Sequence, residues 1–192
     1  MKRYLALLAL ATLMVTGCAV GPQPALSNAG GSGFVKEVPT GIAPAQGFSD
    51  LSVFLSVKTH KAGIYAAGDP HGTTDYKLLL SFDGRPVQLN GRMQSENIEP
   101  TGPRDAEGGD GVRYLFQANL RLLAGTHVME IALPGDDVVV EREVTLPDGS
   151  SSLVLEPLYR SSAGQGLATY PFGNSFREGV SCLRVILNGK ET

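Results

Sequence analysis

The sequence predicts an all-β domain, an antiparallel β-sandwich of the immunoglobulin or transthyretin-like class, and three observations support this. First, the chain contains 24 Gly and 12 Pro among 192 residues, and these divide it into many short segments, which favours strands over a helical bundle. Second, several segments alternate apolar and polar residues with the period of two typical of half-buried strands. Third, short turns separate these segments at roughly 8–12-residue spacing, as in sandwiches.

The clearest strand covers residues 112–122. Its predicted inner face is apolar and consists of Val112, Tyr114, Phe116, Ala118, Leu120 and Leu122. Its other face carries Arg113, Gln117, Asn119 and Arg121, with Leu115 as an exception. A helix fits worse, because positions three and four apart mix apolar and charged residues. We therefore expect the apolar face to point inward as a unit, with Val140, Val144 and Leu146 lining the same interior from a neighbouring strand.

The other elements follow from the same reasoning. Further strands are expected at 51–57, 76–82, 87–89, 127–133, 138–146, 153–155 and 182–187, with a weak candidate at 64–66. Turn-forming residues occupy 83–86, 90–91, 134–137 and 147–150. We expect loops at 68–75 and, over a longer polar stretch, at 94–111, and a fraying end at 188–192.

Charge and hydropathy exclude two classes of function. The formal net charge is -3 at pH 7. This mildly acidic balance argues against a nucleic-acid partner, which requires basic patches. After the first apolar stretch, the chain has no second long apolar run, so we expect no transmembrane helix.

Residues 1–17 have the three parts of an export signal. Lys2 and Arg3 form a positive start, and the apolar stretch that follows is shorter than the about 20 residues of a membrane span. The segment Leu13-Met14-Val15-Thr16-Gly17-Cys18 resembles the lipobox of bacterial lipoproteins. An ordinary secretory signal with a chance cysteine is the alternative.

The lipoprotein resemblance implies a lipid anchor on Cys18. In that family the matching thiol receives a diacylglyceryl group, and cleavage before the cysteine frees an amine that is usually acylated, for example with palmitate. Two or three acyl chains, at ~0.8 kcal/mol per buried CH₂, anchor a protein durably. Ala19 at the next position implies the outer membrane, with the domain facing the periplasm.

The chain divides into three parts: a signal peptide at 1–17, a lipid-anchored flexible linker at 18–47 and a β-sandwich domain at 48–192. The linker is rich in Gly, Pro and Ser, although Phe34, Val35 and Val38 could dock on the domain. The segment 123–131, with 153–159, is similar to PEGA-type and related transthyretin-like surface modules. This resemblance implies a small envelope β-sandwich, and no functional residue is carried over from it.

Four polar residues close together in the sequence are candidates for a metal site: His60, Asp69, His71 and Asp75. Imidazole and carboxylate groups could bind zinc or another divalent ion. Their spacing matches no standard zinc motif, and solvated loops explain them more simply. We therefore predict neither a metal site nor a cofactor.

Other candidates for chemistry have structural interpretations. Cys182 is expected to be a buried, unpaired thiol, because the lipid occupies Cys18, and a catalytic nucleophile is the alternative. His127 should hydrogen-bond to the neighbouring turn. The serine in 173–176 lacks a complete nucleophile elbow. Glu141 and Glu143 should lie on the solvent-exposed face of their strand.

The sequence therefore predicts no catalytic residue. The first hypothesis is a non-enzymatic, lipid-anchored protein whose β-sandwich binds another envelope component or supports an assembly, since sheet edges can pair with a partner strand. The second is a small hydrolase or metal-dependent enzyme that uses His60, His71 or Cys182. The third is a carrier of an apolar ligand between the sheets.

Overall fold

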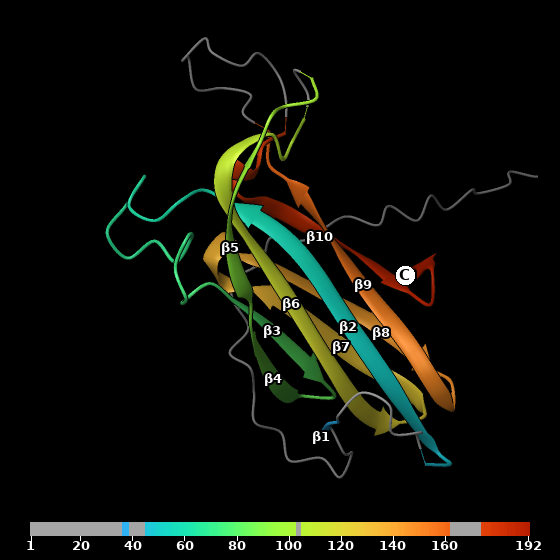
Figure 1. Cartoon of the computed structure of the whole chain (residues 1–192). Coiled ribbons are helices and arrows are strands. Elements are labelled where there is room, and N and C mark those ends of the chain that lie inside the picture. Colours follow the sequence, from blue (N-terminus) through green and yellow to red (C-terminus); the bar gives the residue numbers. More distant parts are fainter. Residues whose placement is uncertain (1–35, 39–44, 103–104, 162–173) are drawn as a thin grey trace, which may run out of the picture.

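The fold is an all-β sandwich of two sheets packed face to face, as the sequence predicts (Figure 1). The structure is a computed structural model that describes residues 36–38, 45–102, 105–161 and 174–192. The signal peptide, Cys18 and most of the linker lie outside these residues. Two 3-10 turns, η1 at Pro134–Asp136 and η2 at Phe176–Glu178, complete the described elements.

The larger sheet has seven strands among the described residues. Its order is β1 (Lys36–Glu37), β6 (Gly109–Leu123), β2 (Phe48–Thr59), β9 (Gly149–Tyr159), β10 (Val180–Leu187) and β11 (Lys190–Glu191), with β5 (Arg92–Ile98) also paired to β6. Strands β5 and β1 pair with the two halves of β6. All pairs in this sheet are antiparallel except β2 with β9, which run parallel.

The smaller sheet is antiparallel. Its order is β4 (Arg85–Asn90), β3 (Lys77–Phe82), β7 (Gly125–Leu133) and β8 (Val138–Leu146). After β2, successive hairpins alternate between the sheets: β3–β4, β5–β6, β7–β8 and β9–β10. The β3–β4 hairpin turns at Asp83 (φ 52°) and Gly84 (φ 77°), the positive values that a type I′ turn requires.

The core fills the space between the sheets, and β6 confirms the predicted alternation. All six residues of its predicted inner face are buried, and Phe116 is fully buried while Gln117 is exposed. Val140, Val144 and Leu146 are buried as well. Their predicted position on a strand next to β6 is wrong, however, because β8 belongs to the opposite sheet and faces β6 across the core.

Three other local predictions are wrong. Residues 92–98 form β5, although the sequence predicted a long loop from residue 94. Their backbone pairs with β6, and all of their side chains are exposed or half-buried. Residues 64–66 form no strand, and Ile64 and Tyr65 are exposed. The chain end does not fray: Asn188 (φ 50°) and Gly189 (φ 78°) form a turn that returns β11 to β10.

Part of the predicted linker belongs to the sheet. Lys36 and Glu37 pair with Arg121 and Leu120 of β6, and the Val38 N–H donates to the carbonyl of Asn119 at 2.9 Å. The first long strand, β2, begins at Phe48, the predicted start of the domain.

Candidate functional site

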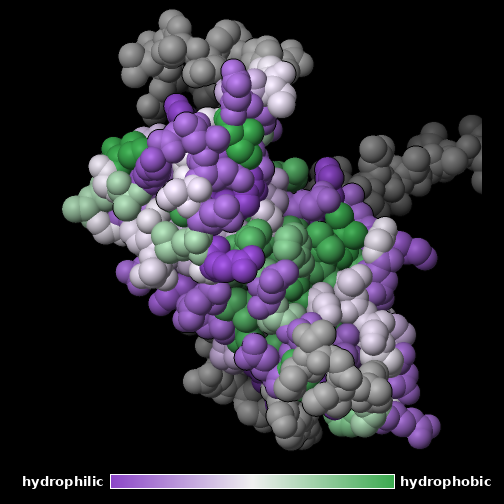
Figure 2. Space-filling model, in the orientation of Figure 1, coloured by the Kyte–Doolittle hydropathy of each residue, from purple (hydrophilic) through white to green (hydrophobic). Residues whose placement is uncertain are grey.

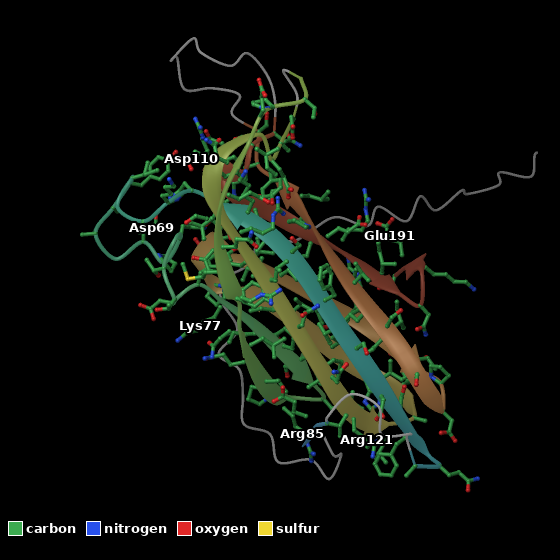
Figure 3. The ribbon with its side chains drawn as sticks, viewed as in Figure 1. Asp69, Lys77, Arg85, Asp110, Arg121 and Glu191 are labelled. Carbon is green, nitrogen blue, oxygen red and sulfur yellow. The ribbon has the colours of Figure 1, made fainter. Side chains whose placement is uncertain are left out.

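One end of the sandwich carries a cleft built by three connections. The first is the segment from His60 to Tyr76 between β2 and β3, and the others are η1 between β7 and β8 and the turn before β10. Figure 3 labels Asp69 at this end, whereas Arg85 and Arg121 lie at the opposite end. The cleft has a volume of about 410 Å³. Its polar lining consists of His60, Tyr65, Asp69, His71, Asp136, Arg160, Arg177 and Glu178.

Asp69 is the point where two imidazoles meet. Its Oδ2 lies 3.2 Å from His60 Nε2, and its Oδ1 lies 2.5 Å from His71 Nδ1. The backbone N–H of His71 also donates to Oδ1, at 3.0 Å. Both histidines are buried, and their ring centroids are 4.8 Å apart. The structure therefore brings together three of the four residues weighed from the sequence.

Asp136 extends this network into the interior. It is 2% exposed, and its Oδ1 lies 3.2 Å from His71 Nε2 and accepts the Val180 N–H at 2.8 Å. Its Oδ2 accepts the Tyr76 hydroxyl at 2.5 Å, and Arg160 donates to its backbone carbonyl. The sequence analysis missed this part of the network, because Asp136 lies 60 residues from Tyr76 and 65 from His71 in the chain, and no local pattern links them.

The network shifts the protonation of its members. Burial raises the pKa of Asp69, but the hydrogen bonds from His71 lower it by more than burial raises it. The pKa of Asp69 is therefore below its usual value. For His71, burial lowers the pKa, and the carboxylates of Asp136 and Asp69 outweigh this and raise it. Burial, followed by the charge of Asp136, raises the pKa of Tyr76 well above its usual value.

Asp75, the fourth weighed residue, does not join this cluster. It lines a separate cleft of about 270 Å³ with Lys77, Leu79 and Gln88. Its own backbone N–H donates to the hydroxyl of Thr73 at 3.1 Å. The spacing of the four residues in sequence gave no sign of this division.

His127 makes the local hydrogen bonds that the sequence predicts. Its Nε2 lies 2.8 Å from the carbonyl oxygen of Leu123. Its Nδ1 lies 2.7 Å from Asp83 Oδ2, a partner that the sequence analysis missed. Asp83 sits in the β3–β4 turn and also accepts the Val128 N–H at 2.9 Å. The pair joins two hairpins of the smaller sheet.

Cys182 is buried, as expected, but it is not an unpaired thiol. It lies in β10 opposite Leu158 of β9 and is disulfide-bonded. The expectation of a lone thiol is therefore wrong. A sulfur in a disulfide is not a nucleophile, and Cys182 does not line the cleft.

The remaining candidates have structural roles. Ser175 caps η2, since its side chain accepts the Arg177 N–H at 3.3 Å. Glu141 and Glu143 are exposed, as predicted. Across from Glu141 lies Glu130, whose Oε1 is buried with no hydrogen-bond partner among the described residues. Burial and the charge of Glu141 raise the pKa of Glu130.

A second surface feature is an apolar row on the outer face of the larger sheet. Phe54 of β2 pairs in register with Val154 of β9, which pairs with Ile186 of β10. Leu115 of β6 lies diagonally next to Phe54. Phe54 is 37% exposed, and the other three are half-buried. Figure 2 shows hydrophobic side chains gathered over this part of the sheet.

Comparisons with known proteins add no assignment. No protein-family model, curated protein or solved structure matches the chain. Within the described residues, no helix has the length and apolar character needed to cross a membrane. The resemblances to lipoproteins and to PEGA-type modules stay predictions.

Proposed function

We propose that this chain is the precursor of a lipid-anchored envelope protein whose β-sandwich is a non-catalytic domain that binds another envelope protein. The lipobox-like segment 13–18 supports the anchor. The observation that carries the binding role is the apolar row of Phe54, Leu115, Val154 and Ile186. It crosses four neighbouring strands on a face that a sandwich normally leaves to polar side chains.

The surroundings of the row suit a protein partner. Ser52 and Gln117, exposed residues of β2 and β6, border the row, and the exposed Arg184–Glu156 ion pair (3.0 Å) borders it on β10 and β9. An apolar centre within a polar border is the usual anatomy of a protein–protein interface. Contiguous apolar patches on a surface mark binding sites more often than chance exposure.

Site-specific photo-crosslinking tests this role in cells. A photoreactive residue at Phe54 or at Val154 should give the same cross-linked product. One at Thr145, exposed on the smaller sheet, should give none. Phe54→Asp should abolish the product formed from position 154 and leave the unfolding midpoint nearly unchanged, because Phe54 faces outward. Equal cross-linking from Thr145, or a product that contains only a second copy of the chain, contradicts the proposal.

A lipid anchor and a disulfide cannot use the same cysteine sulfur. The chain has two cysteines, and a sulfur that carries a diacylglyceryl thioether cannot also join a disulfide. The chemical state of Cys18 in the mature protein distinguishes a lipid-anchored form from a disulfide-bonded one.

A metal-dependent hydrolase is the second candidate, favoured by the meeting of His60, Asp69 and His71 in one cleft. No Ser, Thr or Cys lines that cleft among the described residues, and the second candidate therefore uses an activated water molecule. A panel of esters, phosphoesters and glycosides, assayed with added zinc, tests it. Turnover that Asp69→Asn abolishes supports it, and no turnover rejects it. The carrier of an apolar ligand is not proposed, because buried side chains fill the space between the sheets.

A further inference from the structure

We propose that His60, Asp69 and His71 bind a divalent transition-metal ion of the zinc class. Each offers one ligand atom, and these atoms all lie within 4.8 Å of one another. The site would exist whether or not the chain carries a lipid, and it lies apart from the apolar row. Imidazole nitrogen and carboxylate oxygen are common zinc ligands in proteins.

A hydrogen bond to the backbone orients the ring of His60 toward Asp69. Its Nδ1 lies 2.9 Å from the carbonyl oxygen of Lys61. A carbonyl only accepts, so Nδ1 carries a hydrogen. The other ring nitrogen, Nε2, faces Asp69 Oδ2 at 3.2 Å. A metal-bound imidazole is oriented in the same way, with its second nitrogen hydrogen-bonded to a backbone carbonyl.

His71 repeats this arrangement from the other side. Its Nε2 lies 3.2 Å from Asp136 Oδ1, and Asp136 already accepts from Tyr76 and from the Val180 N–H. His71 Nδ1 lies 2.5 Å from Asp69 Oδ1. Both imidazoles thus direct a ring nitrogen at the same carboxylate.

One metal ion bound by all three groups would satisfy both ring nitrogens and the Asp69 carboxylate at once. The two rings are close enough for this, with centroids 4.8 Å apart. The His127–Asp83 pair shows the contrast: one ring faces one carboxylate at 2.7 Å, and no second imidazole shares that carboxylate among the described residues. That pair is a matched control.

The geometry and surroundings fit such a site. Ligands of a tetrahedral zinc ion with bonds of about 2.0–2.1 Å lie roughly 3.3 Å apart, close to the 3.2 Å between His60 Nε2 and Asp69 Oδ2. The 2.5 Å between His71 Nδ1 and Asp69 Oδ1 has to lengthen when the ion binds. The Lys61 carbonyl and the Asp136 carboxylate are the outer partners that orient metal-bound imidazoles. Three protein ligands beside an open cleft leave a fourth position for water or an exogenous ligand.

Calorimetric titration with zinc chloride tests the site. The chain is purified without a histidine tag and stripped with a chelator. We expect one zinc ion per chain. His60→Gln, His71→Gln and Asp69→Asn should each weaken binding by at least ~100-fold, because each removes a ligand. His127→Gln and Asp75→Asn should bind as the wild type does, and circular dichroism verifies the fold of every variant.

Cobalt provides a second readout. Co²⁺ at a tetrahedral nitrogen and oxygen site should give visible absorption bands that His60→Gln and Asp69→Asn abolish. Asp136→Asn keeps the three ligands but loses the carboxylate that orients His71, so it should weaken zinc binding about 10–100-fold without changing the stoichiometry. If His71→Gln does not fold, the other two ligand variants decide. A wild-type chain that takes up no zinc, or equal affinity in the ligand variants and in His127→Gln, overturns the proposal.

Discussion

Lys58 shows how a single charged residue ties the cleft end of the sandwich together. Its side chain is fully buried. The ammonium donates to the carbonyls of Glu107 and Gly109, each at 2.7 Å, and lies 4.8 Å above the ring of Phe176. A buried ammonium persists only when partners replace its water. Lys58 therefore fixes the loop before β6 and η2 onto the end of β2.

Lys58→Ala should lower the free energy of unfolding by about 2–5 kcal/mol, because it leaves a cavity and two carbonyls without their donor. Lys61→Ala is the control. Lys61 pairs with Asp110 at 2.7 Å, but both side chains are about half exposed, so the change should stay within about 1 kcal/mol. Urea unfolding of both variants measures the difference, and equal losses would contradict the role given to Lys58.

Phe116→Ala should lower the free energy of unfolding by roughly 3–5 kcal/mol, because the ring is fully buried between the sheets. Gln117→Ala, one residue along the same strand, should change it by no more than about half a kcal/mol, because that side chain is exposed. Denaturant unfolding compares the two. Similar losses would mean that the inward face of β6 is wrongly assigned.

Glu96 should make stability fall in acid. A hydrogen bond from Arg113 lowers its pKa below the usual 4.5, and Arg113 NH2 lies 2.7 Å from Glu96 Oε2. A lowered pKa in the folded state stabilises the fold above pH 4.5, and this contribution is lost as the pH falls through the folded-state pKa. Glu96→Gln should flatten the loss of stability below pH 4.5 in urea titrations at several pH values. An unchanged acid slope would contradict this.

At the scale of residues, the sequence predicted which residues of one loop carry the candidate ligands, but not the residues from other elements that line the cleft. His60, Asp69 and His71 are near one another in the chain, so their meeting could be anticipated. Asp136 and Tyr76 reach them only through the packing of η1 against β3. The burial of Lys58 was equally hidden, because its position in β2 alternates with those of apolar residues and reads as a solvent-facing one.

Among the elements, β5 best illustrates what periodicity misses. An edge strand whose side chains are mostly exposed carries little apolar alternation, and backbone pairing with β6 alone defines it. The chain reaches β5 from β4 through Gly91, where it crosses from one sheet to the other. A Cβ at Gly91 would lie 2.9 Å from the tip of the Phe116 ring and 3.1 Å from Tyr114 Cβ.

Gly91→Ala should therefore destabilise the domain by about 1–3 kcal/mol, because the ring of Phe116 is buried and cannot move aside freely. Gly102→Ala is the control, since a Cβ there would meet nothing within 4 Å. Thermal unfolding of the two variants tests this crossing. An unchanged unfolding temperature of Gly91→Ala would contradict this, because it would show that a Cβ at residue 91 fits beside Phe116.

At the scale of the whole molecule, alternation and turns predicted the sandwich but not the sheet to which each strand belongs. A strand such as β8 presents the same inward pattern from either layer, so Val140 could not be assigned from sequence. The parallel pairing of β2 with β9 joins segments about 100 residues apart, and no local signal reports it. Similarly, the apolar row forms only after β2, β6, β9 and β10 lie side by side.

The central claim is that this sandwich works at a membrane on a lipid attached to Cys18. Mass spectrometry of the chain recovered from the membrane fraction, combined with fatty-acid labelling, tests it most directly. We expect a mature chain that begins at Cys18 and carries acyl groups there, with label and membrane association both lost in Cys18→Ser. A mature chain without acyl groups on Cys18, or unchanged labelling of Cys18→Ser, would contradict this proposal.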